Sequence, residues 1–252
     1  MISANKKCIK ETELQEAEYK EKNMAGKLYG IGVGPGDPEL LTLKAVRLIK
    51  ECDIIAVPGK KKEETVAYQI VRQALPEIER KECLEIDMPM TKEKEKLEIS
   101  HNTACEKVAE VLDTGKNIAF LTLGDPCVYS TYIYIHQRIV KAGYDTEIVS
   151  GIPSFCAVSA RLNEGLVERN EMLHVIPSSY GIEQGMELSG TRVLMKAGKK
   201  MKQVKEQLKQ KEVRVSMIEN CGMEQERVYH NVDEIPEEAG YYSLIIVKEQ
   251  EK

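Results

Sequence analysis

Short apolar runs alternate with helical patterns along the first 150 residues of the chain. The runs KLYGIGV, DIIAV and NIAFLTL are rich in Ile, Val and Leu, which is typical of strands that are buried on both faces. Strands are therefore expected at 27–33, 53–57, 83–87 and 117–123. Helices are expected at 38–51, 65–75 and 92–114. Strands joined by helices imply right-handed crossovers, so a largely parallel sheet is predicted.

The pattern changes beyond residue 150, where strands follow one another more closely. They are expected at 172–177, 192–197, 213–220 and 243–248, with one helix near 200–210. This spacing favours a mixed sheet. We therefore predict an N-terminal α/β domain over 26–150 and a C-terminal α/β domain over 151–252. Residues 1–25 are charged and contain no glycine, so a mobile extension is expected there.

Composition excludes several classes of function. The formal net charge is −5, which argues against a nucleic-acid partner, because phosphate binding needs a concentrated basic surface. No apolar run approaches the roughly 20 residues of a membrane span, and the N-terminus lacks the apolar centre of a signal peptide. We expect a cytoplasmic protein with no membrane partner. The 7 cysteines contain no C-x-x-C pair and the 4 histidines form no H-E-x-x-H, so reduced thiols and no protein-ligated metal are predicted.

The glycine-rich stretch GIGVGPGDPELLTLKA, at residues 30–45, fails the dinucleotide pattern G-x-G-x-x-G. Pro35 has no N–H to donate, and Asp37 would place a negative charge where a pyrophosphate should bind. Asp37 is instead expected to be a helix N-cap, with Pro38 at the first helical position. The stretch is either a tight turn before an ordinary capped helix or a turn beside a ligand without phosphate.

A second turn follows the strand predicted at 117–123, in the sequence FLTLGDPCVYST. Gly124, Asp125 and Pro126 stand at the carboxyl end of a parallel strand, which is where open α/β sheets bind ligands. Asp125 is either a helix N-cap or places a carboxylate or backbone oxygen beside a cationic or hydroxyl-bearing ligand. Two Gly-Asp-Pro turns in one sheet favour the ligand.

Six segments in order and spacing resemble the tetrapyrrole methylase family. They are GIGVGPGDPELLTLKA, FLTLGDPCVYST, VSGIPSFCAVSA, RVLMKAGK, MIENCGMEQERVY and YYSLIIVK. The resemblance covers about residues 26–248, and within the family it is to the branch that methylates C20 of precorrin-2 or cobalt-factor II in cobalamin biosynthesis. It implies the two-domain tetrapyrrole methylase fold of the class III methyltransferases. This fold has a mainly parallel N-terminal sheet, a mixed C-terminal sheet and the cofactor cleft between them.

The resemblance also implies S-adenosylmethionine as the cofactor, which carries no phosphate, and S-adenosylhomocysteine as its product. The implied cofactor-binding residues are Pro35, Leu123, Gly124, Asp125, Val128, Pro153, Ser154, Met195, Cys221 and Ser243. Many of these contacts are expected to be main-chain. The family is homodimeric, so a homodimer is expected.

The implied reaction is an in-line displacement in which a meso carbon of the reduced tetrapyrrole attacks the methyl group on sulfur. The carbon must then lose a proton, and Asp125, Tyr129 and Glu219 are candidates to assist, none of them assigned as the base. The substrate carries carboxylates, for which Arg161, Lys196 and Lys199 are the candidate partners, with Lys200 beside them. A solvated basic loop remains the alternative for Lys199 and Lys200. Any cobalt would arrive inside the macrocycle.

Several other functions are alternatives to this one. Another tetrapyrrole methylase would act on uroporphyrinogen III or a later precorrin, and an RNA methylase is disfavoured by the acidic balance. A non-catalytic S-adenosylmethionine sensor would use the same residues for binding alone. A nicotinamide oxidoreductase lacks its G-x-G-x-x-G.

Overall fold

The computed structural model describes residues 24–89, 91, 93–178 and 182–250. Most of the extension predicted at 1–25 therefore lies outside the described residues. The chain divides into two compact units. The first runs to Val33 and continues over Leu41–Gly151, and the second comprises Gly34–Leu40 and the chain from Ile152 onward. The short segment 34–40 thus belongs to the second unit, although its neighbours in sequence belong to the first.

The first unit is built on a parallel sheet of five strands in the order β3-β2-β4-β1-β5. The strands are β1 (Leu28–Gly32), β2 (Ile54–Pro58), β3 (Glu82–Ile86), β4 (Ile118–Thr122) and β5 (Thr146–Val149). In the register of the sheet, Gly32 at the end of β1 lies opposite Thr122 of β4, and Ile31 lies opposite Val149 of β5. The carboxyl ends of these three strands are therefore neighbours.

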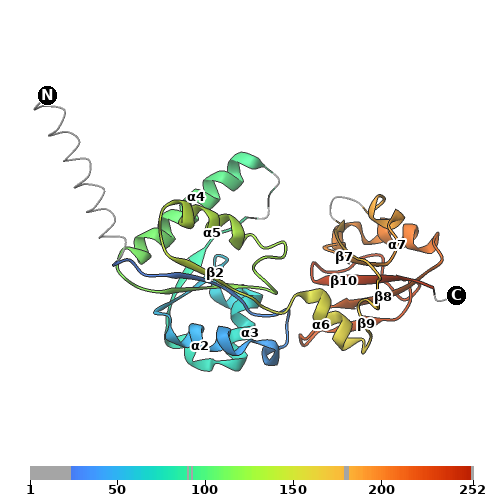
Figure 1. Cartoon of the computed structure of the whole chain (residues 1–252), viewed down its shortest axis with the longest axis horizontal. Helices are drawn as coiled ribbons and strands as arrows, with labels where there is room; N and C mark the ends of the chain where they lie inside the picture. The colour runs from blue at the N-terminus through green and yellow to red at the C-terminus, as the bar shows by residue number, and fades with distance from the viewer. Residues whose placement is uncertain (1–23, 90, 92, 179–181, 251–252) are drawn as a thin grey trace, which may run out of the picture. The chain divides into compact units, whose positions relative to one another are not determined.

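Helices cover both faces of this sheet (Figure 1). They are α2 (Leu43–Glu51) and α3 (Val66–Ala74) on one face, and α4 (Lys94–Leu112) and α5 (Tyr132–Lys141) on the other. Neighbouring residues of one strand point to opposite faces, so Ile55 packs with α2 and α3 while Ile54 packs with α4 and α5. Burial on both faces explains why these strands are continuously apolar. Two 3₁₀ helices, η2 (Lys62–Glu64) and η3 (Pro76–Arg80), flank α3.

The start of α2 differs from the prediction. Residues Pro38–Leu40 form a separate 3₁₀ helix, η1, and α2 begins at Leu43 with Thr42 as its N-cap. The Thr42 hydroxyl accepts the Ala45 N–H at 3.1 Å, whereas the Asp37 carboxylate accepts the Glu39 N–H at 2.8 Å. The prediction of Asp37 as the helix N-cap is therefore wrong. The reason is that Leu40 packs in the core of the second unit, so the chain turns before α2 can begin.

The second unit is built on a mixed sheet of five strands in the order β6-β7-β10-β8-β9. The strands are β6 (Leu173–Pro177), β7 (Thr191–Met195), β8 (Val213–Glu219), β9 (Arg227–Tyr229) and β10 (Ser243–Glu249). β6 and β7 are parallel, while β10 is antiparallel to both β7 and β8, and β8 is antiparallel to β9. The predicted parallel N-terminal sheet and mixed C-terminal sheet are confirmed.

Two helices pack on opposite faces of the second sheet. α7 (Met201–Lys209) contributes Met201, Val204 and Leu208 to one core, and α6 (Ser154–Arg161) contributes Ala157 and Val158 to the other. Two 3₁₀ helices, η5 (Gly185–Glu187) and η6 (Gly198–Lys200), lie in the connections before and after β7. The helix predicted near 200–210 is confirmed, while α6 and β9 were not predicted.

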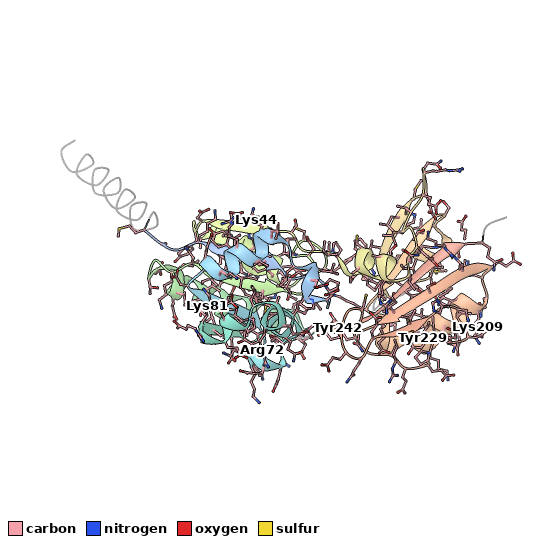
Figure 2. The ribbon with its side chains drawn as sticks, turned by 90° about the horizontal axis from the view of Figure 1, so that it is seen from below. Lys44, Arg72, Lys81, Lys209, Tyr229 and Tyr242 are labelled. Atoms are coloured by element: carbon pink, nitrogen blue, oxygen red, sulfur yellow. The ribbon has the colours of Figure 1, made fainter. Side chains whose placement is uncertain are left out.

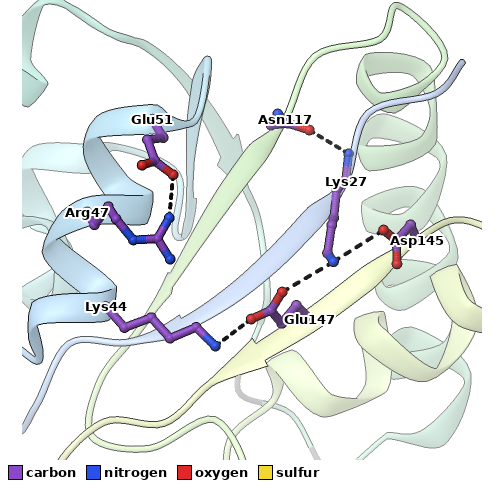
Figure 3. A network of polar contacts seen from close by, with 7 residues as sticks. All are labelled: Lys27, Lys44, Arg47, Glu51, Asn117, Asp145 and Glu147. Carbon is purple, nitrogen blue, oxygen red and sulfur yellow. Dashed lines mark hydrogen bonds and ion pairs between the residues drawn. The ribbon is translucent and has the colours of Figure 1, made fainter.

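An ion-pair network ties the start of the first sheet together (Figure 3). The Lys27 ammonium lies 3.2 Å from a carboxylate oxygen of both Asp145 and Glu147, and Lys44 lies 2.6 Å from Glu147. The Lys27 N–H also donates to the Asn117 side-chain oxygen at 2.8 Å. These contacts join β1, β5, α2 and the start of β4.

Candidate functional site

Asp125 stands in the turn that follows β4, and the residue is 9% exposed. One carboxylate oxygen accepts the Cys127 N–H at 2.7 Å, and the other accepts the Gly151 N–H, just beyond β5, at 3.0 Å. Both oxygens of the carboxylate are thus occupied by backbone donors. Asp125 fastens the turn after β4 to the end of β5, which is a structural task that neither sequence interpretation had foreseen.

Three glycines meet where the ends of β1, β4 and β5 lie side by side. A Cβ atom placed on Gly151 would lie 2.1 Å from the Gly124 carbonyl oxygen, and one placed on Gly32 would lie 2.5 Å from the Gly151 nitrogen. No side chain fits between these backbones. We name Gly32, Gly124 and Gly151 the glycine junction, and it brings the Asp125 turn close to the end of β5.

The other predicted residues of this turn are more exposed than Asp125. Leu123 and Val128 are half-buried, and the Val128 N–H donates to the Asp125 carbonyl at 3.2 Å. Tyr129 is 48% exposed and has a φ of 50°, a left-handed conformation that is uncommon for a residue with a side chain. Such backbone outliers cluster at functional sites, which makes the turn 123–129 the best candidate for ligand contact in the first unit.

The glycine-rich segment 34–40 packs against a loop of the second unit. A Cβ atom placed on Gly36 would lie 2.1 Å from the Cys221 carbonyl oxygen, and one placed on Gly222 would lie 2.5 Å from the Asp37 nitrogen. Pro35 is buried. The glycine at position 36 therefore serves close packing of two backbones, 34–37 against 221–222.

The second unit brings Met195, Ser243 and Cys221 to one end of its sheet. Met195 ends β7 and lies opposite Leu244 of β10, while Ser243 lies opposite Glu219 at the end of β8. Cys221 follows two residues later and is 9% exposed. The three predicted cofactor residues of this sheet are thus neighbours.

Two left-handed residues stand at corresponding places at this end of the sheet. Lys196 directly follows β7 with a φ of 59°, and Asn220 directly follows β8 with a φ of 54°. Beside them, Glu219 accepts the Gly240 N–H at 2.5 Å, and the Lys196 ammonium lies 5.8 Å from the centre of the Tyr241 ring. Tyr242, which is labelled in Figure 2, packs its ring edge-on against Tyr241 and is 39% exposed.

The remaining predicted residues lie on or near α6 and η6. Pro153 and Ser154 begin α6 and are half-buried. Arg161, at the other end of α6, donates from Nε to Glu226 at 2.6 Å. Lys200 is half-buried in η6, and the side chain of Lys199 lies outside the described part of the chain.

A model of the Tetrapyrrole (Corrin/Porphyrin) Methylases matches residues 27–236 of this sequence. The chain belongs to the tetrapyrrole methylases. The resemblance that the motifs indicated is thus confirmed for the family, and the match spans both units of the fold.

Full-length relatives of this tetrapyrrole methylase are known. It is 35% identical over 226 residues to the probable cobalt-precorrin-2 C(20)-methyltransferase of Methanocaldococcus jannaschii, covering 88% of this chain and 96% of that protein. It is 31% identical over 235 residues to the cobalt-precorrin-2 C(20)-methyltransferase of Salmonella typhimurium, covering 90% of this chain and 98% of that one.

The fold of the methylase is also found among solved structures. The uroporphyrin-III C-methyltransferase of Thermus thermophilus, solved in complex with S-adenosylhomocysteine, superposes with a TM-score of 0.66 at 22% identity, covering 89% of this chain and 98% of that one. At this level of identity the likeness shows that the two proteins share a fold.

The thiol of Cys221 is not suited to nucleophilic chemistry in this methylase. Burial raises the pKa of Cys221 to about 11, so the group is a neutral thiol near pH 7. It packs in an apolar cluster with Val158 of α6 and Ile218 of β8. As a small apolar group it lines the end of the sheet.

Glu226 and Gly222 are residues of the site region that motif comparison did not single out. Glu226 lies 65 positions from Arg161 in sequence, so their contact cannot be predicted from the residue spacing of a helix or a strand. Gly222 stands within the segment ENCGMEQERVY, but only the packing against Asp37 shows why a glycine is needed there. Within the described residues, no group of three or more His, Cys, Asp or Glu side chains could hold a metal ion.

Proposed function

We propose that this tetrapyrrole methylase transfers the methyl group of S-adenosylmethionine to C20 of precorrin-2 or cobalt-factor II in cobalamin biosynthesis. The observation that carries the proposal is the 35% identity to the Methanocaldococcus jannaschii relative, because it extends over 96% of a probable cobalt-precorrin-2 C(20)-methyltransferase. The Salmonella relative supports the same substrate and the same carbon.

The proposed cofactor residues have the chemistry of a site for a ligand without phosphate. They are Pro35, Leu123, Gly124, Asp125, Val128, Pro153, Ser154, Met195, Cys221 and Ser243. The set contains no Lys or Arg, and its single carboxylate is already occupied by two backbone N–H groups. Phosphate sites are instead lined by Lys, Arg or free backbone N–H groups. The structural neighbour that holds S-adenosylhomocysteine shares the fold, which supports the same cofactor here.

When bound, S-adenosylmethionine supplies a methyl group on a sulfonium, which is a good leaving group. The protein then has to align the reacting atoms and exclude water. Alignment lowers the activation barrier by roughly 7–11 kcal/mol in favourable systems. Met195 and Cys221 offer apolar contact for this purpose, and Asp125 holds its turn in place.

The loss of the C20 proton needs an acceptor, and the sequence offers Asp125, Tyr129 and Glu219 as candidates. Asp125 is the least suited because both of its oxygens accept backbone N–H groups. Glu219 uses one oxygen for Gly240, and Tyr129 is exposed in the turn after β4. We propose Glu219 and Tyr129 as the residues to test for this role, and Lys196 and Lys199 for the substrate carboxylates.

A methyl-transfer assay tests the proposal. The protein is incubated with labelled S-adenosylmethionine and, separately, with precorrin-2, cobalt-factor II and uroporphyrinogen III, and the added methyl group is located by mass spectrometry and NMR. Transfer to C20 of either of the first two is expected. Methylation of a pyrrole β-carbon would assign the protein to another branch. Cofactor binding without transfer to any tetrapyrrole would favour a sensor.

We also propose that the protein acts in the cytoplasm as a homodimer. The homodimer rests on family resemblance alone, and light scattering coupled to size-exclusion chromatography would test it, a monomeric mass rejecting it. Among the helices of the described residues, none could span a bilayer.

A further inference from the structure

Arg161, Glu226 and Gly222 form a connected set of contacts in the second unit. The Nε–H of Arg161, in the last turn of α6, donates to one oxygen of Glu226 at 2.6 Å, and the other oxygen of Glu226 accepts the Gly222 N–H at 2.8 Å. The Glu226 side chain is 16% exposed and that of Arg161 is 59% exposed. The carboxylate therefore joins a helix end to the backbone of the loop 220–226.

The loop 220–226 is folded tightly on itself. The Met223 N–H donates to the Asn220 carbonyl at 2.9 Å, and the Glu226 N–H donates to the Met223 carbonyl at 3.0 Å. The Asn220 side-chain amide donates to the Gln225 carbonyl at 3.3 Å. Movement of Glu226 would therefore shift the backbone at Cys221 and Gly222.

The other side of this loop meets the glycine-rich segment. Gly36 packs on the Cys221 carbonyl, and Gly222 packs on the backbone of Asp37, so closely that no Cβ atom fits at either glycine. Pro35 and Cys221, two of the proposed cofactor residues, are thus positioned by one backbone contact. The contacts run from α6 through Glu226 to the loop 220–226 and on to the segment 34–37.

We infer that Arg161 and Glu226 form a clasp that positions Cys221 and Pro35 for the cofactor, so that Arg161 is a positioning residue of the cofactor site. The inference rests on the proposed function, since it assigns these two residues to the same site. An exposed ion pair alone contributes little to stability. Here the carboxylate is largely buried and also accepts a backbone N–H, so loss of Arg161 leaves a largely buried carboxylate without one of its hydrogen bonds, and loss of Glu226 removes the acceptor of the Gly222 N–H.

The clasp and the earlier prediction of Arg161 as a substrate ligand have different consequences. A guanidinium that binds a substrate carboxylate would affect the KM of the tetrapyrrole, and loss of the competing Glu226 would leave that KM unchanged or lower it. A clasp requires both residues, and its loss acts on the cofactor. The two roles can therefore be separated by comparing Arg161 variants with a Glu226 variant.

The test compares R161M, E226Q and the double variant with the unmodified protein. R161M keeps an unbranched apolar stem and removes the guanidinium with its charge. We expect each single variant to weaken S-adenosylhomocysteine binding, measured by calorimetry, by about five-fold or more, because a hydrogen bond to a charged group is lost. The double variant should bind no more weakly than the worse single variant, since both changes break the same contact. The KM of the tetrapyrrole should stay unchanged.

Two further variants sharpen the comparison. R161K keeps the positive charge but lacks the planar fork, so it should lose part of the affinity for S-adenosylhomocysteine. R214M breaks the pair between Arg214 and Glu164, which lie 3.0 Å apart in the same unit, and it should bind as the unmodified protein does. A raised tetrapyrrole KM in R161M, with normal S-adenosylhomocysteine binding in R161M and E226Q, would overturn the clasp.

Hydrogen exchange separates failure of the clasp from failure of the proposed function. If the unmodified protein binds no S-adenosylhomocysteine, the proposed cofactor is rejected. The clasp still predicts that the Gly222 amide exchanges faster in E226Q and R161M than in R214M, because Glu226 is the acceptor of that N–H. Unchanged exchange at Gly222 in both variants would reject the clasp whether or not the cofactor binds.

Discussion

At the scale of single residues, the contacts of the Asp125 carboxylate give this motif residue a structural task within the first unit. Its carboxylate accepts the N–H groups of Cys127 and Gly151, so it holds the turn after β4 against the end of β5. Leu123, Gly124 and Val128, the other proposed cofactor residues of this turn, depend on that position. An aspartate in this turn is therefore explained by geometry before any contact with the cofactor is considered.

Asp125→Asn is expected to weaken S-adenosylhomocysteine binding by about ten-fold. The amide keeps one accepting oxygen and turns an NH₂ group toward the second backbone N–H, which leaves a buried donor unpaired at a cost of about 1–3 kcal/mol. Calorimetric titration of S-adenosylhomocysteine measures the effect. Asp53→Asn is the control, since Asp53 accepts a single exposed N–H, that of Asn117, at 2.8 Å. Unchanged affinity together with a large loss of kcat would instead make Asp125 the proton acceptor.

At the scale of elements, the glycine junction decides how closely β1, β4 and β5 can approach at their carboxyl ends. Gly32 ends β1, Gly124 follows β4 and Gly151 follows β5, and a Cβ atom on Gly32 or on Gly151 would collide with the backbone of the other two glycines. Backbone contact of this kind depends on the absence of a Cβ atom and not on the chemistry of a side chain. The junction is thus a packing device that serves the turn carrying Asp125.

Gly151→Ala is expected to lower the free energy of unfolding by about 3 kcal/mol, near the upper end of overpacking costs. The added methyl group would lie 2.1 Å from the Gly124 carbonyl oxygen, which is backbone and cannot rotate away. The midpoint of urea unfolding measures the change. Gly165→Ala is the matched control, because the nearest atom to its Cβ would be 3.8 Å away. Equal midpoints for the two variants would show that the junction has more room than described.

The ion-pair network of β1 and β5 gives a pH-dependent contribution to stability. Hydrogen bonds from Lys44 and Lys27 hold the pKa of Glu147 below its ordinary value. A carboxyl whose folded pKa is depressed stabilises the fold above its unfolded pKa, which is about 4.3, and loses that contribution as the pH falls toward the folded pKa.

Glu147→Gln should therefore lower the unfolding free energy at pH 7 by up to about 1 kcal/mol, as for other surface ion pairs. The difference from the unmodified protein should shrink below about pH 4.3, as urea titrations at several pH values would show. Glu110→Gln is the control, since Glu110 is exposed on α4 and makes no ion pair within the described residues. A difference that is constant from pH 7 to pH 3 would show that charge is not the cause.

At the scale of the whole molecule, the sequence predicted a parallel first sheet and a mixed second sheet. It could do so because the spacing of apolar residues along a strand indicates which of its faces are buried. The runs DIIAV and NIAFLTL are apolar at every position since helices cover both faces of the first sheet. Helix α6 escaped prediction because its eight residues, SFCAVSAR, are short and follow a Gly-Ile-Pro turn. Its role in the core of the second unit depends on partners that lie far away in sequence.

The candidate site was predictable in its motifs and less so in its contacts. Family resemblance placed Met195, Cys221 and Ser243 together, and the register of β7, β10 and β8 brings them to one end of the sheet. The N-cap prediction failed at Asp37. Its side chain is suitable for capping, but Thr42 caps α2 because Leu40 is packed in the second unit. The partner of Arg161 could not be predicted either, since no local spacing links positions 161 and 226.

The place of the segment 34–40 has a consequence for synthesis of the chain. The segment contacts Cys221 and Gly222, which the ribosome adds 185 and 186 residues after Gly36. At a synthesis rate of roughly 5–20 residues per second, residues 34–40 are made on the order of ten to forty seconds before the residues that they contact. The first unit has received all of its strands well before then, whereas Gly34–Leu40 still lacks the residues that it contacts in the second unit. A fragment that starts at Ile152 would lack this turn, and supplying residues 34–40 as a separate peptide would show whether the second unit recruits it.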